Sequence, residues 1–168
     1  AVEGSDITIV GMSRTAVIAE DAAKQLARKG IGAEVIDLRT LSPLDETSVL
    51  ESLGKTGRLV VVDESNPYCS MASEIAGLVV ERGFDTLDAP VKRVTSPHTP
   101  VPATPCLEAN YVPSVERVVA AVEETLSYRQ EQKKRPRDDH SEKSDAANKP
   151  GDGCRGVDAA SSCGTLRV

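Results

Sequence analysis

Two loops hold the side chains of this sequence that could do acid–base chemistry. Asp63 and Glu64 follow the aliphatic run Leu59–Val62, and His98 lies in the proline-rich segment Ser96–Pro102. Adjacent carboxylates could divide general acid and base roles, and a loop histidine could act as a general base near neutral pH. No serine, cysteine or carboxylate is obviously paired with His98, so packing among its prolines is the favoured interpretation. For Asp63 and Glu64 we favour a solvated loop start.

The first strand-to-helix turn lacks the features of a dinucleotide site. Gly11 follows one aliphatic run and Asp37 ends the next, which is the order of a glycine loop followed by a ribose-binding acid. Residues 11–16, Gly-Met-Ser-Arg-Thr-Ala, contain one glycine, and the bulky side chains would keep a pyrophosphate from the backbone. A plain turn is therefore predicted there.

Composition changes sharply near residue 127. A chain of 168 residues is long enough for one ordinary domain and too short for two. Residues 128–168 hold nine basic and seven acidic residues and few large aliphatics, too little apolar surface to offset the entropy of ordering. We predict a folded domain at residues 1–127 and a disordered polar tail at residues 128–168. The predicted domain has eleven basic and nineteen acidic residues, a net charge of −8, which argues against nucleic acid and favours a basic protein partner.

The cysteines and the hydropathy exclude further classes of protein. The four cysteines are scattered and none forms Cys-x-x-Cys, so neither a zinc site nor a redox pair is indicated. No apolar run approaches the ~20 residues of a membrane span, and no signal peptide opens the chain. We expect a cytoplasmic protein, or a mitochondrial matrix protein if the source is eukaryotic.

Apolar periodicity predicts alternating strands and helices. Short aliphatic runs predict strands at residues 7–10, 33–37, 59–62 and 91–95. Apolar stripes at helical spacing predict helices over residues 19–27, 72–79 and 115–126. Gly30 is expected to stop the first helix, and Ser42 with Pro43 to start the second. This alternation predicts an α/β fold, a three-layer α/β/α sandwich of parallel strands joined by right-handed crossovers.

Five segments carry a resemblance to a known family. They are residues 6–10, 34–45, 55–64, 87–94 and the Pro-His-Thr-Pro-Val-Pro loop at 97–102. In this order they resemble the carboxyl-terminal transketolase-like domain of the β subunit of thiamine diphosphate-dependent 2-oxo acid dehydrogenases. Asn66-Pro67 with Cys69-Ser70, together with the histidine loop, looks most like acetoin dehydrogenase β chains, with pyruvate dehydrogenase β next. The resemblance covers residue 2 to about residue 126.

The resemblance implies a mostly parallel five-stranded sheet with one antiparallel edge strand, of which Ala1–Glu3 would be the stub. It implies that thiamine diphosphate and Mg²⁺ belong to the assembled enzyme and are not bound by this domain alone. A preceding pyrimidine-binding domain would supply the activating glutamate, and the α subunit would hold the diphosphate and the metal. Gly151-Asp152-Gly153 is similar to the start of the magnesium-diphosphate motif, but no asparagine follows, so we treat it as chance. No cofactor-binding or metal residue is expected here, and His98 is the one weak catalytic candidate.

The partners implied by the resemblance are a second β subunit, the α subunit, and the basic subunit-binding domain of the acyltransferase core. Asp88 of Leu-Asp-Ala-Pro occupies a position where relatives carry an acid that contacts that domain, although it could equally be a turn residue. The implied role is β association and docking, without catalysis by the domain itself, in an oxidoreductase that decarboxylates pyruvate or cleaves acetoin. Alternatives are a fragment of another transketolase-superfamily enzyme and a stand-alone interaction module.

Overall fold

A parallel sheet forms the centre of the computed structural model, which describes residues 1–134 and the side chains of residues 1–128. Within these residues the strands are β1 (Ile7–Gly11), β2 (Ala33–Asp37), β3 (Leu59–Val62) and β4 (Lys92–Val94). Their order is β2-β1-β3-β4, and every neighbouring pair is parallel. The strands predicted from the aliphatic runs are thus confirmed, with β4 two residues shorter.

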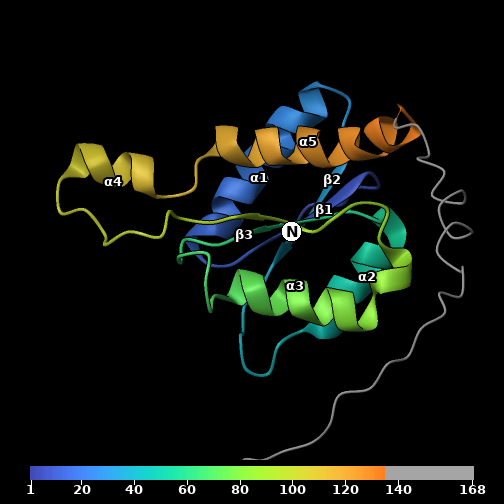
Figure 1. The fold of residues 1–168 in the computed structure, drawn as a ribbon, viewed down its shortest axis with the longest axis horizontal. Helices are drawn as coiled ribbons and strands as arrows, with labels where there is room; N and C mark the ends of the chain where they lie inside the picture. The colour runs from blue at the N-terminus through green and yellow to red at the C-terminus, as the bar shows by residue number, and fades with distance from the viewer. Residues whose placement is uncertain (135–168) are drawn as a thin grey trace, which may run out of the picture. The chain divides into compact units, whose positions relative to one another are not determined.

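Helices cover both faces of the sheet (Figure 1). Helices α1 (Arg14–Arg28) and α5 (Val115–Lys134) lie on one face, and α2 (Glu46–Thr56) and α3 (Met71–Arg82) on the other. Successive strand residues point to opposite faces, so Ile7 and Ile9 pack with α1 and α5, whereas Val10 packs with α2 and α3. The predicted α/β fold, with a parallel sheet between helices, is confirmed.

The antiparallel edge strand implied by the resemblance is a single bridge in the described residues. Val2 and Val35 exchange backbone hydrogen bonds of 3.3 and 2.9 Å, and the Ala1 ammonium group donates to the Val35 carbonyl oxygen at 2.7 Å. This contact lies at the outer edge of β2. A full fifth strand is not confirmed.

Helix α2 begins later than the sequence predicted. Residues Leu41 to Leu44 form a turn closed by a bridge between these two leucines, and the Thr40 hydroxyl donates to the Pro43 carbonyl oxygen at 3.0 Å. Asp45 is the true cap, since its carboxylate accepts the Ser48 N–H at 3.1 Å. The predicted start at Ser42 and Pro43 is wrong because those residues close a local turn of their own.

The remaining elements are the 3-10 turn η1 (Phe84–Thr86) and helix α4 (Pro105–Tyr111). Helix α1 ends as predicted, because Gly30 adopts φ +79° beyond it. Helix α5 continues to Lys134, past the predicted domain boundary at residue 127, and the predicted tail beyond residue 134 lies outside the described residues. Within residues 1–134 we find no helix with the length and apolarity needed to cross a membrane.

Candidate functional site

A cleft opens at the carboxyl ends of the strands, between the connections that follow β1 and β3. In the sheet, β2 lies on one side of β1 and β3 lies on the other. The connection from β1 to β2 and the connection from β2 to β3 therefore run in opposite directions across the sheet, and the strand order reverses between β1 and β3. Open parallel sheets bind ligands at such a point. The cleft has a volume of about 700 Å³. Its lining comes from the β1–α1 turn, the segment after β2 and the loop after β3: Met12, Ser13, Ala16, Val17, Glu20, Asp37, Leu38, Arg39, Leu41, Asp63, Glu64 and Ser65.

Asp63 organises the loop after β3. Its side chain is 2% exposed, and its two carboxylate oxygens accept the N–H of Ser65 at 2.9 Å and the N–H of Ala72 at 3.1 Å. Ala72 lies in the first turn of α3, where a carboxylate meets the positive end of the helix dipole. The arrangement therefore gives Asp63 a structural role, holding the loop against the start of α3.

Glu64 does not share that environment. It is exposed, and its carbonyl oxygen accepts the Ser96 hydroxyl at 2.8 Å, while the Ser96 N–H donates to Ser65 at 3.1 Å. These bonds join the loops that follow β3 and β4. An acid–base pair needs two side chains aimed at one reacting atom, whereas Asp63 is buried with its oxygens committed and Glu64 faces solvent. The preference for a loop start over an acid–base pair remains our interpretation. The predicted solvation is wrong for Asp63, which is buried because its carboxylate holds the loop against α3, and it holds for Glu64, which is exposed.

The turn after β1 is fixed by its own side chains. A Cβ on Gly11 would lie 2.8 Å from the Ala16 nitrogen, so only glycine fits this close approach. The Thr15 hydroxyl lies 2.9 Å from the carbonyl oxygens of both Met12 and Val62 and accepts the Met12 N–H at 3.0 Å. Ser13 adopts φ +52°. The polar groups at this turn are thus used to join β1, α1 and β3.

The charges in the cleft do not fit a magnesium diphosphate group. Among the described residues, Arg39 is the one basic residue in the lining, and its Nε lies 2.7 Å from the Asp37 carboxylate. Glu20 and Glu64 add negative charge, which repels phosphate. No cluster of three or more His, Cys, Asp or Glu side chains that could hold a metal occurs in the described part of the chain. The Gly151-Asp152-Gly153 segment lies outside the described residues.

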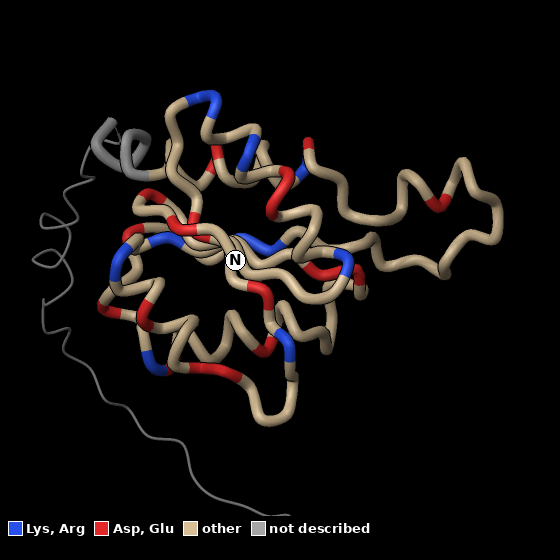
Figure 2. The backbone as a smooth tube through the Cα atoms, turned by 180° about the vertical axis from the view of Figure 1, so that it is seen from behind, with Lys and Arg blue, Asp and Glu red and all other residues tan. Residues whose placement is uncertain are grey.

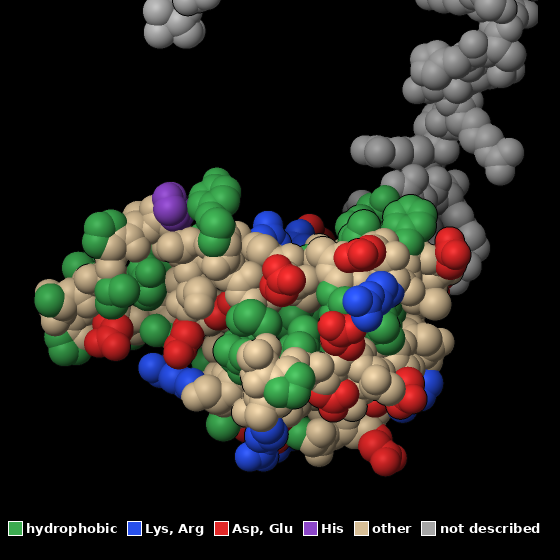
Figure 3. All heavy atoms as spheres, turned by 90° about the horizontal axis from the view of Figure 1, so that it is seen from below, with side chains coloured by type: hydrophobic (Ala, Val, Ile, Leu, Met, Phe, Trp, Pro, Cys, Tyr) green, Lys and Arg blue, Asp and Glu red, His purple; other side chains and the backbone are tan. Residues whose placement is uncertain are grey.

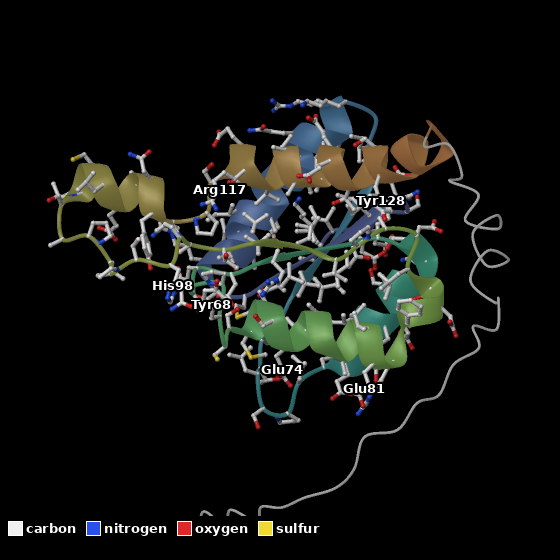
Figure 4. All side chains as sticks on the ribbon, viewed as in Figure 1. Tyr68, Glu74, Glu81, His98, Arg117 and Tyr128 are labelled. Atoms are coloured by element: carbon white, nitrogen blue, oxygen red, sulfur yellow. The ribbon has the colours of Figure 1, made fainter. Side chains whose placement is uncertain are left out.

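His98 lies at the same end of the sheet, in the loop after β4. Its ring meets that of Tyr68 edge-on, with centroids 4.9 Å apart and an interplanar angle of 86° (Figure 4). Both side chains are exposed. A general base is normally oriented by a hydrogen-bond acceptor, and among the described residues His98 is held instead by an aromatic contact. The geometry favours a surface contact, and a catalytic role for His98 stays a prediction.

Helix α4, which sequence reasoning missed, extends this end of the molecule. With the preceding loop it projects from the body as an arm, residues 97–112 (Figure 1). None of the α4 residues is buried, and Val101 and Leu107 are 68% and 56% exposed. The arm has one acidic residue, Glu108, and no lysine or arginine (Figure 2). Its signal in the sequence was Pro105 at the first helical position.

Asp88 lies at the opposite end of the sheet, before β4. Its N–H donates to the Gly57 carbonyl oxygen at 2.7 Å, and its carboxylate lies 3.8 Å from the Arg58 guanidinium. The Asp88 side chain is 42% exposed. Asp88 is therefore both a turn residue, as one prediction had it, and an accessible acid.

A second hollow, which we call the Phe84 groove, adjoins Asp88 and has a volume of about 710 Å³. It is lined mainly by apolar side chains from α3, from the η1–β4 segment and from α5: Ala76, Val80, Phe84, Asp85, Leu87, Asp88, Ala89, Pro90, Val91 and Tyr128. Phe84 is 67% exposed and Val80 52%. The sequence signal was Val80, an aliphatic residue next to the buried stripe of α3.

Two of the shifted pKa values belong to exposed residues at helix α2, away from the cleft lining. The Ser48 hydroxyl and N–H lower the pKa of the Asp45 carboxyl by hydrogen bonding to it. A hydrogen bond to Glu34 raises the pKa of Lys55, whose Nζ lies 2.7 Å from that carboxylate. These shifts come from helix capping and a surface ion pair, and they do not indicate catalytic groups.

A protein-family model described as "Transketolase, C-terminal domain" matches residues 1–118. The chain is 51% identical over 124 residues to acetoin:2,6-dichlorophenolindophenol oxidoreductase subunit beta of Bacillus subtilis, covering 74% of this chain and 36% of that protein. It is 46% identical over 125 residues to the mitochondrial pyruvate dehydrogenase E1 component subunit beta of Caenorhabditis elegans, again 74% and 36%. The chain thus spans about a third of the length of these curated relatives.

A solved structure described as a split gene transketolase, inactive beta4 tetramer, superposes with a TM-score of 0.68 at 32% identity. The superposition covers 76% of this chain and 41% of that one. Sequence and fold therefore agree on one family.

Proposed function

Since the chain belongs to the transketolase C-terminal domain family, we propose that it serves as the carboxyl-terminal domain of the β subunit of a thiamine diphosphate-dependent dehydrogenase acting on acetoin or pyruvate. The observation that carries the proposal is the similarity, over 124 and 125 residues, to β subunits named for those two substrates. In the assembled enzyme the cofactor supplies the carbanion chemistry. Other domains would hold it, because the cleft residues described above do not fit a magnesium diphosphate group.

The role proposed for this domain is association and docking. The side chains at the carboxyl edge of the sheet are engaged in holding loops together, and Asp63 is the clearest case. The exposed apolar arm and the Phe84 groove are surfaces rather than reaction centres. We infer association with a second β subunit and with an α subunit, and docking to the subunit-binding domain of the acyltransferase core.

Asp88 is the residue proposed for that docking. The partner domain is expected to be basic, and residues 1–127 have a net charge of −8. Reversing this charge with Asp88→Lys should weaken capture of a recombinant subunit-binding domain by about tenfold at low salt, and less as salt screens the contact. Asp21→Lys is the matched control, since Asp21 is also an exposed acid paired with a base, Lys24 at 2.8 Å. Equal affinities for the two variants would refute the assignment.

A transketolase-type enzyme is the second candidate, favoured by the similarity to the split-gene transketolase structure. Sugar phosphate substrates require basic side chains or free N–H groups around the phosphate. Arg39 is the one basic side chain that lines the described cleft, and it is bound to Asp37. The dehydrogenase assignment is therefore preferred.

The intact mass of the native protein, measured after immunoprecipitation from its source cell, tests whether this domain is part of a longer β subunit. A mass roughly twice the 17.8 kDa of this sequence is expected for a β subunit of two such domains. A native mass of 17.8 kDa would contradict the dehydrogenase proposal and leave a stand-alone interaction module. The compartment would be the cytoplasm, or the mitochondrial matrix in a eukaryote.

A further inference from the structure

We propose that the cleft at the carboxyl ends of the strands binds a small organic cation, an ammonium or guanidinium group carried on a short aliphatic body. The cleft is lined entirely by residues 12–65, so this binding does not depend on the proposed dehydrogenase function. Its volume of about 700 Å³ is in the range of sites that bind small ligands. It also lies where the strand order reverses, which is where open parallel sheets bind ligands.

Apolar side chains give the cleft a surface for an aliphatic body. Ala16 and Leu38 are buried in its lining, and Met12 is half-buried. Val17 of α1 and Leu41 of the turn after β2 also line it, and they are 59% and 48% exposed. A ligand that covers these two side chains releases the water in contact with them, which is favourable in proportion to the apolar area buried.

Charge favours a cation in this cleft. The described lining has four carboxylates and one guanidinium, and that guanidinium, of Arg39, lies 2.7 Å from the Asp37 carboxylate. Asp63 is also committed, because both of its oxygens accept backbone N–H groups. Glu20 and Glu64 remain, and neither forms an ion pair with another described residue. These two carboxylates are therefore the groups that a bound cation would face.

The surroundings of Glu20 and Glu64 leave their carboxylates available. Lys24 lies one turn beyond Glu20 on α1, but its Nζ is 2.8 Å from Asp21, and Glu20 attracts it without an ion pair. Glu64 is exposed, and its bond with the Ser96 hydroxyl uses its backbone carbonyl oxygen at 2.8 Å. Both carboxylates can therefore turn toward a ligand in the cleft.

The arm at the same end of the molecule is also an exposed apolar surface, but its charge selects less. Figure 3 shows hydrophobic side chains gathered over the arm. Residues 97–112 hold one acidic residue, Glu108, and no lysine or arginine. The cleft instead combines an apolar surface with two available carboxylates. That combination favours an alkyl cation over a neutral or anionic molecule of the same shape.

The test measures binding of n-butylguanidinium chloride to the full 168-residue chain by two-dimensional NMR, with backbone amide shifts as the readout. The comparison ligands are n-butylurea, which has nearly the same shape without the charge, and pentanoate. We expect n-butylguanidinium to shift the amides of residues 12–20, 37–41 and 63–65. It should bind about fivefold more tightly than n-butylurea at low salt, and the difference should shrink as salt screens the carboxylates.

Two pairs of variants separate the charge from the apolar surface. Glu64→Gln should weaken n-butylguanidinium binding about threefold and leave n-butylurea binding unchanged. Its control is Glu81→Gln, an exposed acid of α3 outside the cleft, which should change neither (Figure 4). Val17→Ser should weaken binding of both ligands about twofold. Val80→Ser, a helix valine of similar exposure at 52% and also outside the cleft, should weaken neither.

Each contrary result overturns a stated part of the proposal. Equal binding of n-butylurea and n-butylguanidinium, or tighter binding of pentanoate, would show that the site does not select a cation. Amide shifts confined to residues outside the cleft, or undiminished binding by both Glu64→Gln and Val17→Ser, would rule out this cleft as the site. No amide shift with n-butylguanidinium would overturn the whole proposal. The dehydrogenase assignment would stand in each case, because the native mass tests it separately.

Discussion

Replacing Asp63 by asparagine tests whether the most buried carboxylate of the cleft is structural. In the native protein each of its oxygens accepts one N–H, from Ser65 at 2.9 Å and from Ala72 at 3.1 Å. Hydrogen bonds to a charged group contribute about 1.5–3 kcal/mol each. Asparagine keeps one acceptor and turns its amide NH₂ group toward the other N–H. We therefore expect Asp63→Asn to lower the free energy of unfolding by about 2–3 kcal/mol.

Urea denaturation followed by circular dichroism measures this loss. With a slope of about 1–3 kcal/mol per molar urea, the midpoint should fall by about 1–2 M. Glu64→Gln is the matched control, because the adjacent side chain is exposed and should shift the midpoint little. If Asp63→Asn unfolds at the same urea concentration as the unmodified protein, the structural account of this carboxylate is wrong.

Three further predictions concern local geometry. Gly57→Ala should destabilise the protein by about 1–2 kcal/mol, because Gly57 adopts φ +66° and its Cβ would lie 3.0 Å from the Asp88 carboxylate; Gly54→Ala, where nothing lies within 4 Å, should be neutral or stabilising in the same urea assay. Ser13→Gly should stabilise by about 1 kcal/mol, since Ser13 adopts φ +52° and its side chain makes no capping bond; a loss of stability in a thermal melt would contradict this. Ser48→Ala should raise the pKa of Asp45 toward its ordinary value in an NMR titration while Thr47→Ala leaves it unchanged. The stability from that bond is present above the ordinary pKa and lost as the pH falls through the lowered one, so an identical Asp45 titration in Ser48→Ala would refute the assigned cause.

The sheet could be predicted from the sequence because its signals are local. The run of residues 59–62 is aliphatic throughout, as expected for a strand covered on both faces, and all four of its residues are buried. The end of helix α1 at Gly30 could also be predicted, because glycine readily adopts the positive φ found there. The start of α2 was misplaced because Ser42-Pro43 and Asp45 both carry capping signals. Only the bridge between Leu41 and Leu44 decides between them.

The roles of the site residues depend on contacts between distant segments, which no local pattern contains. Asp63 is structural because Ala72, nine residues later, turns its N–H toward it. The Phe84 groove forms only when α3 and the segment before β4 meet Tyr128 of α5. Helix α4 escaped prediction because it lacks a buried stripe, which is the feature that periodicity detects. That its apolar residues form an exposed surface follows from the position of α4 on the projecting arm, which the sequence pattern does not contain.

A chimeric β subunit would show whether this domain can serve in a thiamine diphosphate-dependent dehydrogenase. Residues 1–126 replace the matched segment of the Bacillus subtilis relative, and the chimera is purified with its α subunit and assayed for acetoin-dependent reduction of 2,6-dichlorophenolindophenol. We expect the chimera to assemble and to be active, whereas the 168-residue chain mixed with the same α subunit should give no turnover. A folded chimera that neither assembles nor turns over acetoin, or turnover by the chain without the remainder of a β subunit, would contradict it.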